Sequence, residues 1–131
     1  RHCENAQAVA EHLQSHEKIA WVRYSGLPGD PYHALAEKYL PLGSCGVVSF
    51  GVKGGREAAG RFMKALRLGA IATHVADART CCLHPASSTH RQMNDRELEA
   101  AGVPADMVRL SVGLESREDL IEDLAQALAA L

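Results

Sequence analysis

An arginine in an alternating segment is the clearest candidate for chemistry in this sequence. Between 107 and 112, a period of two places the valines and the leucine on one face of a strand, and Arg109 and Ser111 on the other. If the apolar set packs beneath helices, Arg109 stands on an open face. Its planar guanidinium can hold a carboxylate or a phosphate with two parallel hydrogen bonds. A solvated surface arginine or a structural salt bridge fits the same pattern, so the strand alone leaves these alternatives open.

Three histidines and a cysteine lie close together in the sequence, but their spacing predicts no metal site and no nucleophile. His74, His84 and His90 have no carboxylate or thiolate at a recognised zinc-ligand spacing. Cys82 and His84 would share a strand face, yet no third residue is placed to orient the histidine as a base. The roles of His84 and His90 stay open.

The glycine-rich segment 51–56 precedes a predicted helix and resembles a phosphate-binding loop. It lacks the glycine, lysine and serine or threonine order of a P-loop. We therefore predict an ordinary strand-to-helix turn here.

Composition predicts one globular domain covering residues 1–131. Hydrophobic residues make up 47% and charged residues 23% of the chain, which suffices for a buried core. The formal net charge of -2 provides no basic excess for nucleic acid or for an anionic membrane surface. No apolar run approaches the roughly 18 residues that a membrane helix needs. We therefore predict neither a nucleic-acid partner nor a membrane partner.

The four cysteines show no spacing typical of a disulfide framework, so we expect reduced thiols and a cytoplasmic protein. Cys81 and Cys82 are adjacent on a predicted strand and should point to opposite faces. The sequence begins at Arg1 inside a predicted helix and without methionine, so we expect a preceding segment.

Periodicity divides the chain into alternating helices and strands that bury one side of each helix. Asn94 and Ser116 begin capping patterns before two of the helices, and the polar segment 84–90 should lie on the surface or line a cleft. The simplest arrangement is a two-layer α+β sandwich, a small mixed or antiparallel sheet with helices on one face. Helices are predicted over 4–16, 33–39, 59–66, 94–101 and from 117 onward, and strands over 18–24, 46–52, 70–73, 79–83 and 107–112.

Several segments together resemble the pyridoxal-phosphate (PLP) enzymes of cysteine and methionine metabolism, and within them the O-acetylhomoserine sulfhydrylase branch. The most specific are His-Pro-Ala-Ser-Ser-Thr-His at 84–90 and Arg-Leu-Ser-Val-Gly-Leu-Glu at 109–115. The resemblance covers the chain from end to end, with further matches at 1–6, 21–28, 46–55 and 101–103.

This resemblance implies the carboxy-terminal small domain of a longer enzyme with the aspartate-aminotransferase-like fold, called fold type I. The open sheet face would then pack toward a larger cofactor-binding domain. The implied reaction is replacement of the acetate of O-acetylhomoserine by sulfide or a thiol, giving homocysteine or methionine. The alternatives are the small domain of a methionine or cystathionine γ-lyase and a non-catalytic amino-acid-binding module.

The resemblance also implies a role for two residues of this chain. The family's arginine at the position of Arg109 holds the substrate α-carboxylate. A second contact comes from a serine or asparagine just before a hydrophobic-Gly-Asp-Ala stretch, and the matching position here is His74. The stretch itself reads Val-Ala-Asp-Ala at 75–78, so Ala76 replaces the family's glycine.

Pyridoxal phosphate is implied for the parent enzyme and not for this chain. In the family a lysine in a Ser-x-Thr-Lys segment of the larger domain holds the cofactor as a Schiff base. None of the four lysines, Lys18, Lys38, Lys53 and Lys64, lies in such a segment. We therefore predict no catalytic or cofactor-binding residue here and no reaction by the chain alone. A homotetrameric parent is implied, and an uncovered sheet face could make this chain self-associate.

Overall fold

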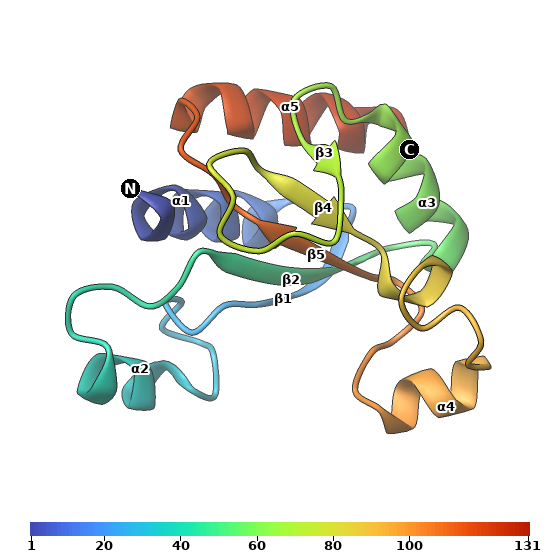
Figure 1. Ribbon diagram of the computed structural model, residues 1–131, viewed down its shortest axis with the longest axis horizontal. Helices are drawn as coiled ribbons and strands as arrows, with labels where there is room; N and C mark the ends of the chain where they lie inside the picture. Colours follow the sequence, from blue (N-terminus) through green and yellow to red (C-terminus); the bar gives the residue numbers. More distant parts are fainter.

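The computed structural model describes residues 1–131 and contains one five-stranded mixed sheet in the order β1-β2-β5-β4-β3 (Figure 1). The pairs β1/β2, β2/β5 and β4/β5 are antiparallel, and the short pair β3/β4 is parallel. The strands are β1 (Ile19–Arg23), β2 (Val47–Val52), β3 (Ala70–Ile71), β4 (Cys81–Leu83) and β5 (Met107–Ser111).

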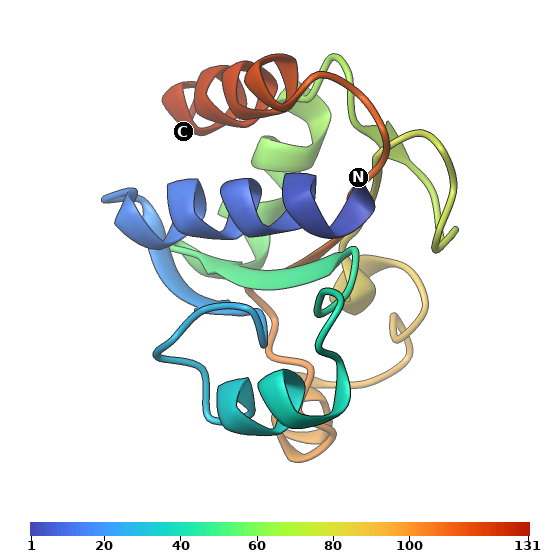
Figure 2. The ribbon, with the colours of Figure 1, turned by 90° about the vertical axis from the view of Figure 1, so that its left-hand side faces the viewer.

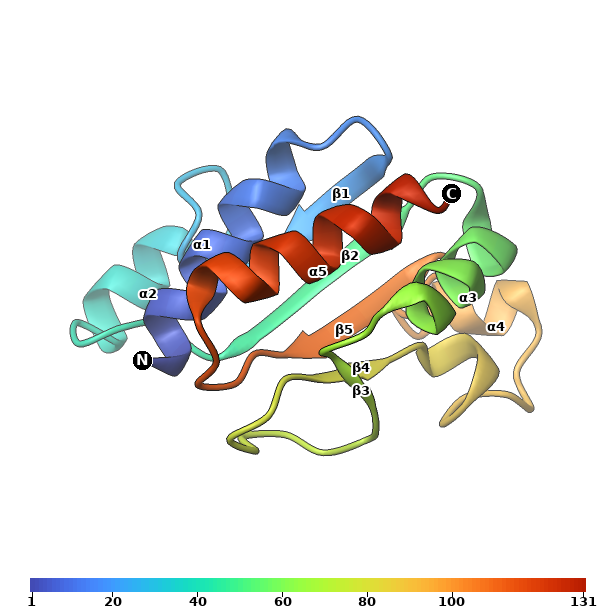
Figure 3. The same ribbon diagram turned by 90° about the horizontal axis from the view of Figure 1, so that it is seen from above.

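Three long helices cover one face of this sheet. Seen from above, α5 lies between α1 and α3 and packs against both (Figure 3). Two shorter helices, α2 and α4, lie beyond the opposite face near its two ends (Figures 1 and 2). The helices are α1 (His2–Ser15), α2 (His33–Tyr39), α3 (Gly55–Ala65), α4 (Asp95–Ala100) and α5 (Arg117–Ala129), with a 3₁₀ turn η1 at Pro85–Ser87.

The core fills the space between the sheet and the three long helices. Phe50 of β2 meets Phe62 of α3 edge to face, with ring centroids 5.6 Å apart and planes at 89°. Val108 and Leu110 of β5 point into the same cluster, as does the buried stripe of α1. The predicted α+β sandwich is therefore confirmed, with the mixed form of the sheet.

Adjacent cysteines separate to the two faces as strand alternation predicts. Cys82 belongs to the core cluster beneath the helices, whereas Cys81 is buried on the other side. Burial raises the pKa of the Cys82 thiol, which therefore stays protonated and unreactive in the core. This placement leaves no activated Cys82–His84 pair.

Both predicted capping patterns begin helices, but only one is complete. Asn94 accepts bonds from the backbone N–H groups of Arg96 and Glu97, and the Glu97 carboxylate accepts from the Asn94 N–H. At Ser116 the hydroxyl accepts weakly from the Asp119 N–H at 3.4 Å, with no bond in return. The shorter aspartate side chain replaces the glutamate that closes the first box.

The glycine pair after β2 makes the predicted strand-to-helix turn. Gly54 and Gly55 have φ of 103° and 70°, in the left-handed region that glycine adopts most easily. The backbone conformation of the turn therefore accounts for the two glycines without a phosphate-binding loop.

Candidate functional site

Arg109 lies in the middle of β5, on the sheet face away from α1, α3 and α5. Its neighbours Val108 and Leu110 are 0% and 1% exposed in the helix-side core, so alternation turns Arg109 to the other face. Ser49 of β2 and Leu83 of β4 are its partners in the flanking antiparallel ladders. The structure thus places Arg109 on the face that the sequence pattern predicts.

The guanidinium of Arg109 has no acidic partner within the chain. Nη2 donates a hydrogen bond of 3.0 Å to the carbonyl oxygen of Thr73, and Nε is buried with no partner. None of the four ion pairs of the chain includes this residue. A buried N–H without a partner costs about 1–3 kcal/mol. The positive charge is therefore oriented by a neutral carbonyl and left uncompensated.

The connection from β3 to β4, residues 72–80, is bound to this same face. Thr73 contributes its carbonyl to Arg109, and the Ala76 N–H donates to Oγ of Ser111 at 3.0 Å. Ser111 was predicted on the face of Arg109, and it is found there. The contribution of Thr73 could not be predicted, because every residue has a backbone carbonyl and the residue type does not show which one will bind Arg109.

His74 lies on this connection, directly after Thr73, and is exposed. Its imidazole makes no hydrogen bond and no ion pair. The pKa of Asp77 is lowered, first by the backbone N–H of Arg79 and then by the charges of Arg79 and His74. The structure therefore brings the His74 segment to Arg109 but does not join the two side chains.

Ala76 is the one non-glycine residue with a positive φ, at 60°. The left-handed region costs an L-residue about 1–2 kcal/mol, chiefly because Cβ approaches the following carbonyl. The resemblance described in the sequence analysis implies a glycine at this position. The turn has the left-handed backbone that glycine adopts most easily, with alanine in its place.

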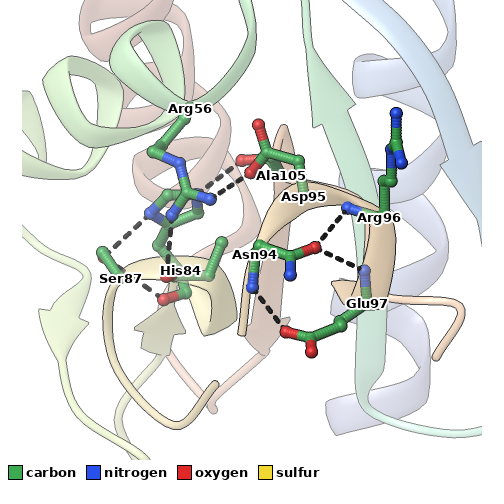
Figure 4. A network of polar contacts seen from close by, with 9 residues as sticks. Arg56, His84, Ser87, Asn94, Asp95, Arg96, Glu97 and Ala105 are labelled. Atoms are coloured by element: carbon green, nitrogen blue, oxygen red, sulfur yellow. Dashed lines mark hydrogen bonds and ion pairs between the residues drawn. The ribbon is translucent and has the colours of Figure 1, made fainter. Parts of the chain in front are cut away.

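The segment 84–90, predicted to lie on the surface or to line a cleft, is buried at residues 84–86 and is exposed or half-buried from 87 to 90. His84 is 2% exposed, and both ring nitrogens have partners (Figure 4): Nδ1 with Oγ of Ser87 at 2.8 Å, and Nε2 with the Ala105 carbonyl at 2.8 Å. Because a carbonyl can only accept, Nε2 carries a proton and donates it to Ala105, while Nδ1 is paired with the Ser87 hydroxyl. Both ring nitrogens are thus engaged within the fold.

Arg56 extends this polar network from the first turn of α3 (Figure 4). Nη1 donates to the Ala86 carbonyl at 2.8 Å, and Nη2 pairs with Oδ1 of Asp95 at 2.5 Å. The arginine thereby links α3, η1 and the start of α4. His90 lies nearby on the surface side, where Nδ1 meets the Thr89 hydroxyl at 2.9 Å. These contacts fix one end of the open face.

The lysines do not fit a Schiff-base anchor for pyridoxal phosphate near Arg109. Lys18 donates to the Leu128 carbonyl at 2.9 Å, and Lys64 is exposed on α3, so both belong to the helix-covered side. Lys38 lies over the Tyr39 ring on α2, and Lys53 is exposed in the turn after β2. The four lysines thus lie on other elements than β5 and the connection 72–80, which contain Arg109 and its partner Thr73.

Comparison with known proteins agrees with the architecture and with the motifs. The family model described as Cys/Met metabolism PLP-dependent enzyme matches residues 1–129. A crystal structure of an O-acetylhomoserine (thiol)-lyase from Campylobacter jejuni, with a pyridoxyl-lysine monophosphate residue, superposes with a TM-score of 0.90 at 40% identity. It covers 98% of this chain, and the match is 30% of that chain.

Curated relatives point in the same direction. O-acetyl-L-homoserine sulfhydrylase 1 of Thermus thermophilus is 48% identical over 98% of this chain, and homocysteine synthase of Schizosaccharomyces pombe is 44% identical over 98%. An L-methionine gamma-lyase of Fusobacterium nucleatum is 45% identical over 98%. The chain spans about 30% of the length of these relatives.

The mixed sheet, with helices on one face and an arginine on the other, is thus the α+β small domain of fold-type-I enzymes. The chain belongs to the family of PLP-dependent enzymes of cysteine and methionine metabolism. None of its helices is both long enough and apolar enough to span a bilayer.

Proposed function

We propose that this chain is the substrate-binding small domain of a longer PLP-dependent enzyme, and that Arg109 binds the α-carboxylate of an amino-acid substrate. The observation that carries the proposal is the uncompensated guanidinium on the sheet face away from the three long helices. A fixed arginine fork matches a carboxylate with two charge-assisted bonds. His74, on the connection that holds Arg109, supplies a second donor to the same carboxylate.

We further propose that the parent enzyme is an O-acetylhomoserine sulfhydrylase, in which acetate is replaced by sulfide or a thiol. The names of the relatives from Thermus thermophilus and Leptospira meyeri, 48% and 46% identical, support this choice. The cofactor is then held by the larger domain, against which the open face of this sheet packs.

Replacement of Arg109 in the full-length protein tests the proposed carboxylate site. Arg109→Ala removes both charged bonds, worth about 2 to 5 kcal/mol, so KM for the amino acid should rise about 30-fold or more. The cofactor absorbance should stay unchanged, because the substitution touches no cofactor anchor.

Arg23 offers a matched control on the same face. It lies opposite Ser49, the residue that is itself opposite Arg109, and its exposed guanidinium lies over the Trp21 ring at 5.9 Å. Arg23→Ala removes the same charge two strands away and should leave KM as in the wild type. An unchanged KM for Arg109→Ala, or equal increases in both variants, would contradict a specific carboxylate site.

A γ-lyase remains the second candidate, because two methionine gamma-lyases are 42% and 45% identical to this chain. The two activities differ in their substrates. A sulfhydrylase incorporates sulfide into O-acetylhomoserine, whereas a lyase releases a thiol from methionine without an acceptor. Assaying both reactions on one preparation decides between them, and thiol release from methionine as the faster reaction would overturn the sulfhydrylase proposal.

A further inference from the structure

The segment 109–115 binds the β3–β4 connection at four successive points. Arg109 bonds to Thr73 and Ser111 bonds to Ala76, as described above. The Leu114 N–H then donates to the Ala78 carbonyl at 2.8 Å. Glu115 makes the fourth contact, with Thr80. The two segments therefore run side by side in the same direction, one contact following the next.

The last contact is the strongest, and it is made by Glu115. Its Oε1 accepts from the Thr80 backbone N–H at 2.6 Å, and its Oε2 accepts from the Thr80 hydroxyl at 2.9 Å. The same hydroxyl accepts from the Gly113 N–H at 2.8 Å, and Thr80 is only 3% exposed. Bonds to a carboxylate are roughly twice as strong as neutral ones. Glu115 therefore fixes the end of the connection through two bonds to one residue.

Gly113 makes this close approach possible. A Cβ at this position would collide with the Ala78 carbonyl oxygen and with Oε2 of Glu115. Asn5 of α1, buried at 2% exposure, donates to the carbonyls of both Gly113 and Glu115 at 3.0 Å. The helix layer therefore fixes the backbone that carries the Glu115 carboxylate.

We infer that Glu115 is a positioning residue for the carboxylate site: by fixing Thr80 it fixes the connection 72–80, and with it the Thr73 carbonyl that orients Arg109. This inference rests on the proposed carboxylate-binding role of Arg109. Glu115 touches no substrate and acts only through this backbone. Small displacements of a binding group cost large factors in rate or affinity, so the anchor sets how well the guanidinium is presented.

The test uses Glu115→Gln in the full-length protein. The amide keeps the shape but removes the negative charge, so the two charge-assisted bonds to Thr80 become weaker neutral ones. KM for the amino acid should rise about tenfold, with kcat and cofactor absorbance nearly unchanged. Hydrogen exchange of the peptide 72–80 should become faster, which reports the freed connection independently of activity. Glu118→Gln, an exposed glutamate three residues further on, should change neither quantity.

Thr80 gives a second, independent pair of variants. Thr80→Val removes the hydroxyl and should raise KM as Glu115→Gln does, whereas Thr80→Ser restores the hydroxyl and should restore KM. Because Thr80→Val also leaves the Gly113 N–H unpaired, the comparison with serine separates the hydroxyl contact from a general loss of folding. If Glu115→Gln lowers kcat and cofactor absorbance by as large a factor as it raises KM, the positioning role is overturned.

A double variant separates this inference from the proposed function. If Glu115 acts through Arg109, Glu115→Gln should raise KM much less than tenfold in an Arg109→Lys background. A full tenfold increase there, or a wild-type KM for Glu115→Gln alone, overturns the positioning role while the carboxylate site stands. An Arg109→Lys protein with the wild-type KM instead overturns the proposed function itself.

Discussion

The imidazole of His84 donates through Nε2 to the carbonyl of Ala105 across 2.8 Å, which joins the end of β4 to the segment that leads into β5. The other ring nitrogen is paired with the Ser87 hydroxyl. One buried ring therefore joins two connections of the chain. The sequence leaves the role of His84 open, and its contacts are those of a structural residue.

Replacing His84 should destabilise the fold. His84→Ala leaves the Ala105 carbonyl unpaired and opens a cavity, so the free energy of unfolding should fall by about 2–4 kcal/mol. Ser87→Ala removes only one of the two bonds and should cost about 1 kcal/mol. Urea unfolding of both variants measures the difference. If His84→Ala and Ser87→Ala were equally stable, the hydrogen bond to Ala105 would contribute nothing to stability.

Restoring glycine at position 76 should stabilise the protein. Ala76 has φ of 60°, so Ala76→Gly relieves the left-handed strain and should raise the free energy of unfolding by about 1 kcal/mol. Ala78→Gly, two residues along the same connection and without a positive φ, adds only chain entropy to the unfolded state and should lower stability. Thermal unfolding of both proteins shows whether their stability changes in opposite directions. An Ala76→Gly protein less stable than the wild type would contradict the claim that Ala76 is strained.

Asp123 of α5 binds the segment between α3 and β3. Its carboxylate accepts from the backbone N–H groups of Arg67, Leu68 and Gly69 at 2.8 to 3.0 Å. Burial alone would raise its pKa, but these bonds and one from Gln126 outweigh burial and lower the pKa below the ordinary value. The ionised form is therefore the one that the fold stabilises.

The lowered pKa of Asp123 predicts a dependence of stability on pH. Its contribution is complete above the ordinary pKa of about 4, and is lost as the pH falls through the lower folded value. Asp123→Asn should cost about 2–3 kcal/mol at neutral pH, because the amide N–H₂ faces N–H donors. The difference in the free energy of unfolding between Asp123→Asn and the wild type should become smaller at acid pH. Glu122→Gln, exposed on the same helix, should show no such narrowing in urea titrations from pH 7 to 3.

The two capping residues should differ in their contribution. Asn94→Ala removes both forward bonds of a complete box, at about 1 kcal/mol. Ser116→Ala removes a single long bond of 3.4 Å and should cost less, although α5 is the longer helix. Urea unfolding of the two variants measures which one loses more stability. A larger loss of stability in Ser116→Ala would contradict the prediction that the Asn94 cap contributes more.

Pyridoxal phosphate added to the 131-residue chain should give no site-specific Schiff base. Its lysines are dispersed over the helix side, α2 and an exposed turn, and none is buried beside an anion site. Reduction with borohydride followed by peptide mapping measures the label on each lysine. Stoichiometric labelling of one lysine, lost in its arginine variant, would show that the chain has an anchor of its own.

The sequence predicted those features that depend on neighbours along the chain. Alternation placed Arg109 and Ser111 on the sheet face away from the three long helices, and α2 has the predicted bounds of 33–39. The Asn94 box was also found, because its two partners lie within three residues. Local spacing is sufficient for such features, since each is a matter of one turn or one strand period.

The features that escaped prediction depend on distant backbone. The polar composition of 84–90 favours a surface or cleft-lining loop, whereas buried His84 has a ring partner, the Ala105 carbonyl, that lies 21 residues away. Likewise Thr73 meets Arg109 over 36 residues, and Glu115 meets Thr80 over 35. Such partners are chosen by the topology of the sheet, which no local pattern encodes.

The pairing of β2 with β5 at the centre of the sheet joins residues 47–52 with 107–111. On the ribosome, β1 and β2 are therefore made before their central neighbour β5. Their apolar side, with Val48 and Phe50, lacks that neighbour until residues 107–111 have been synthesised. Such non-local pairing is typical of slowly folding domains. The interval between the synthesis of β2 and of β5 is thus when this protein most needs protection from aggregation.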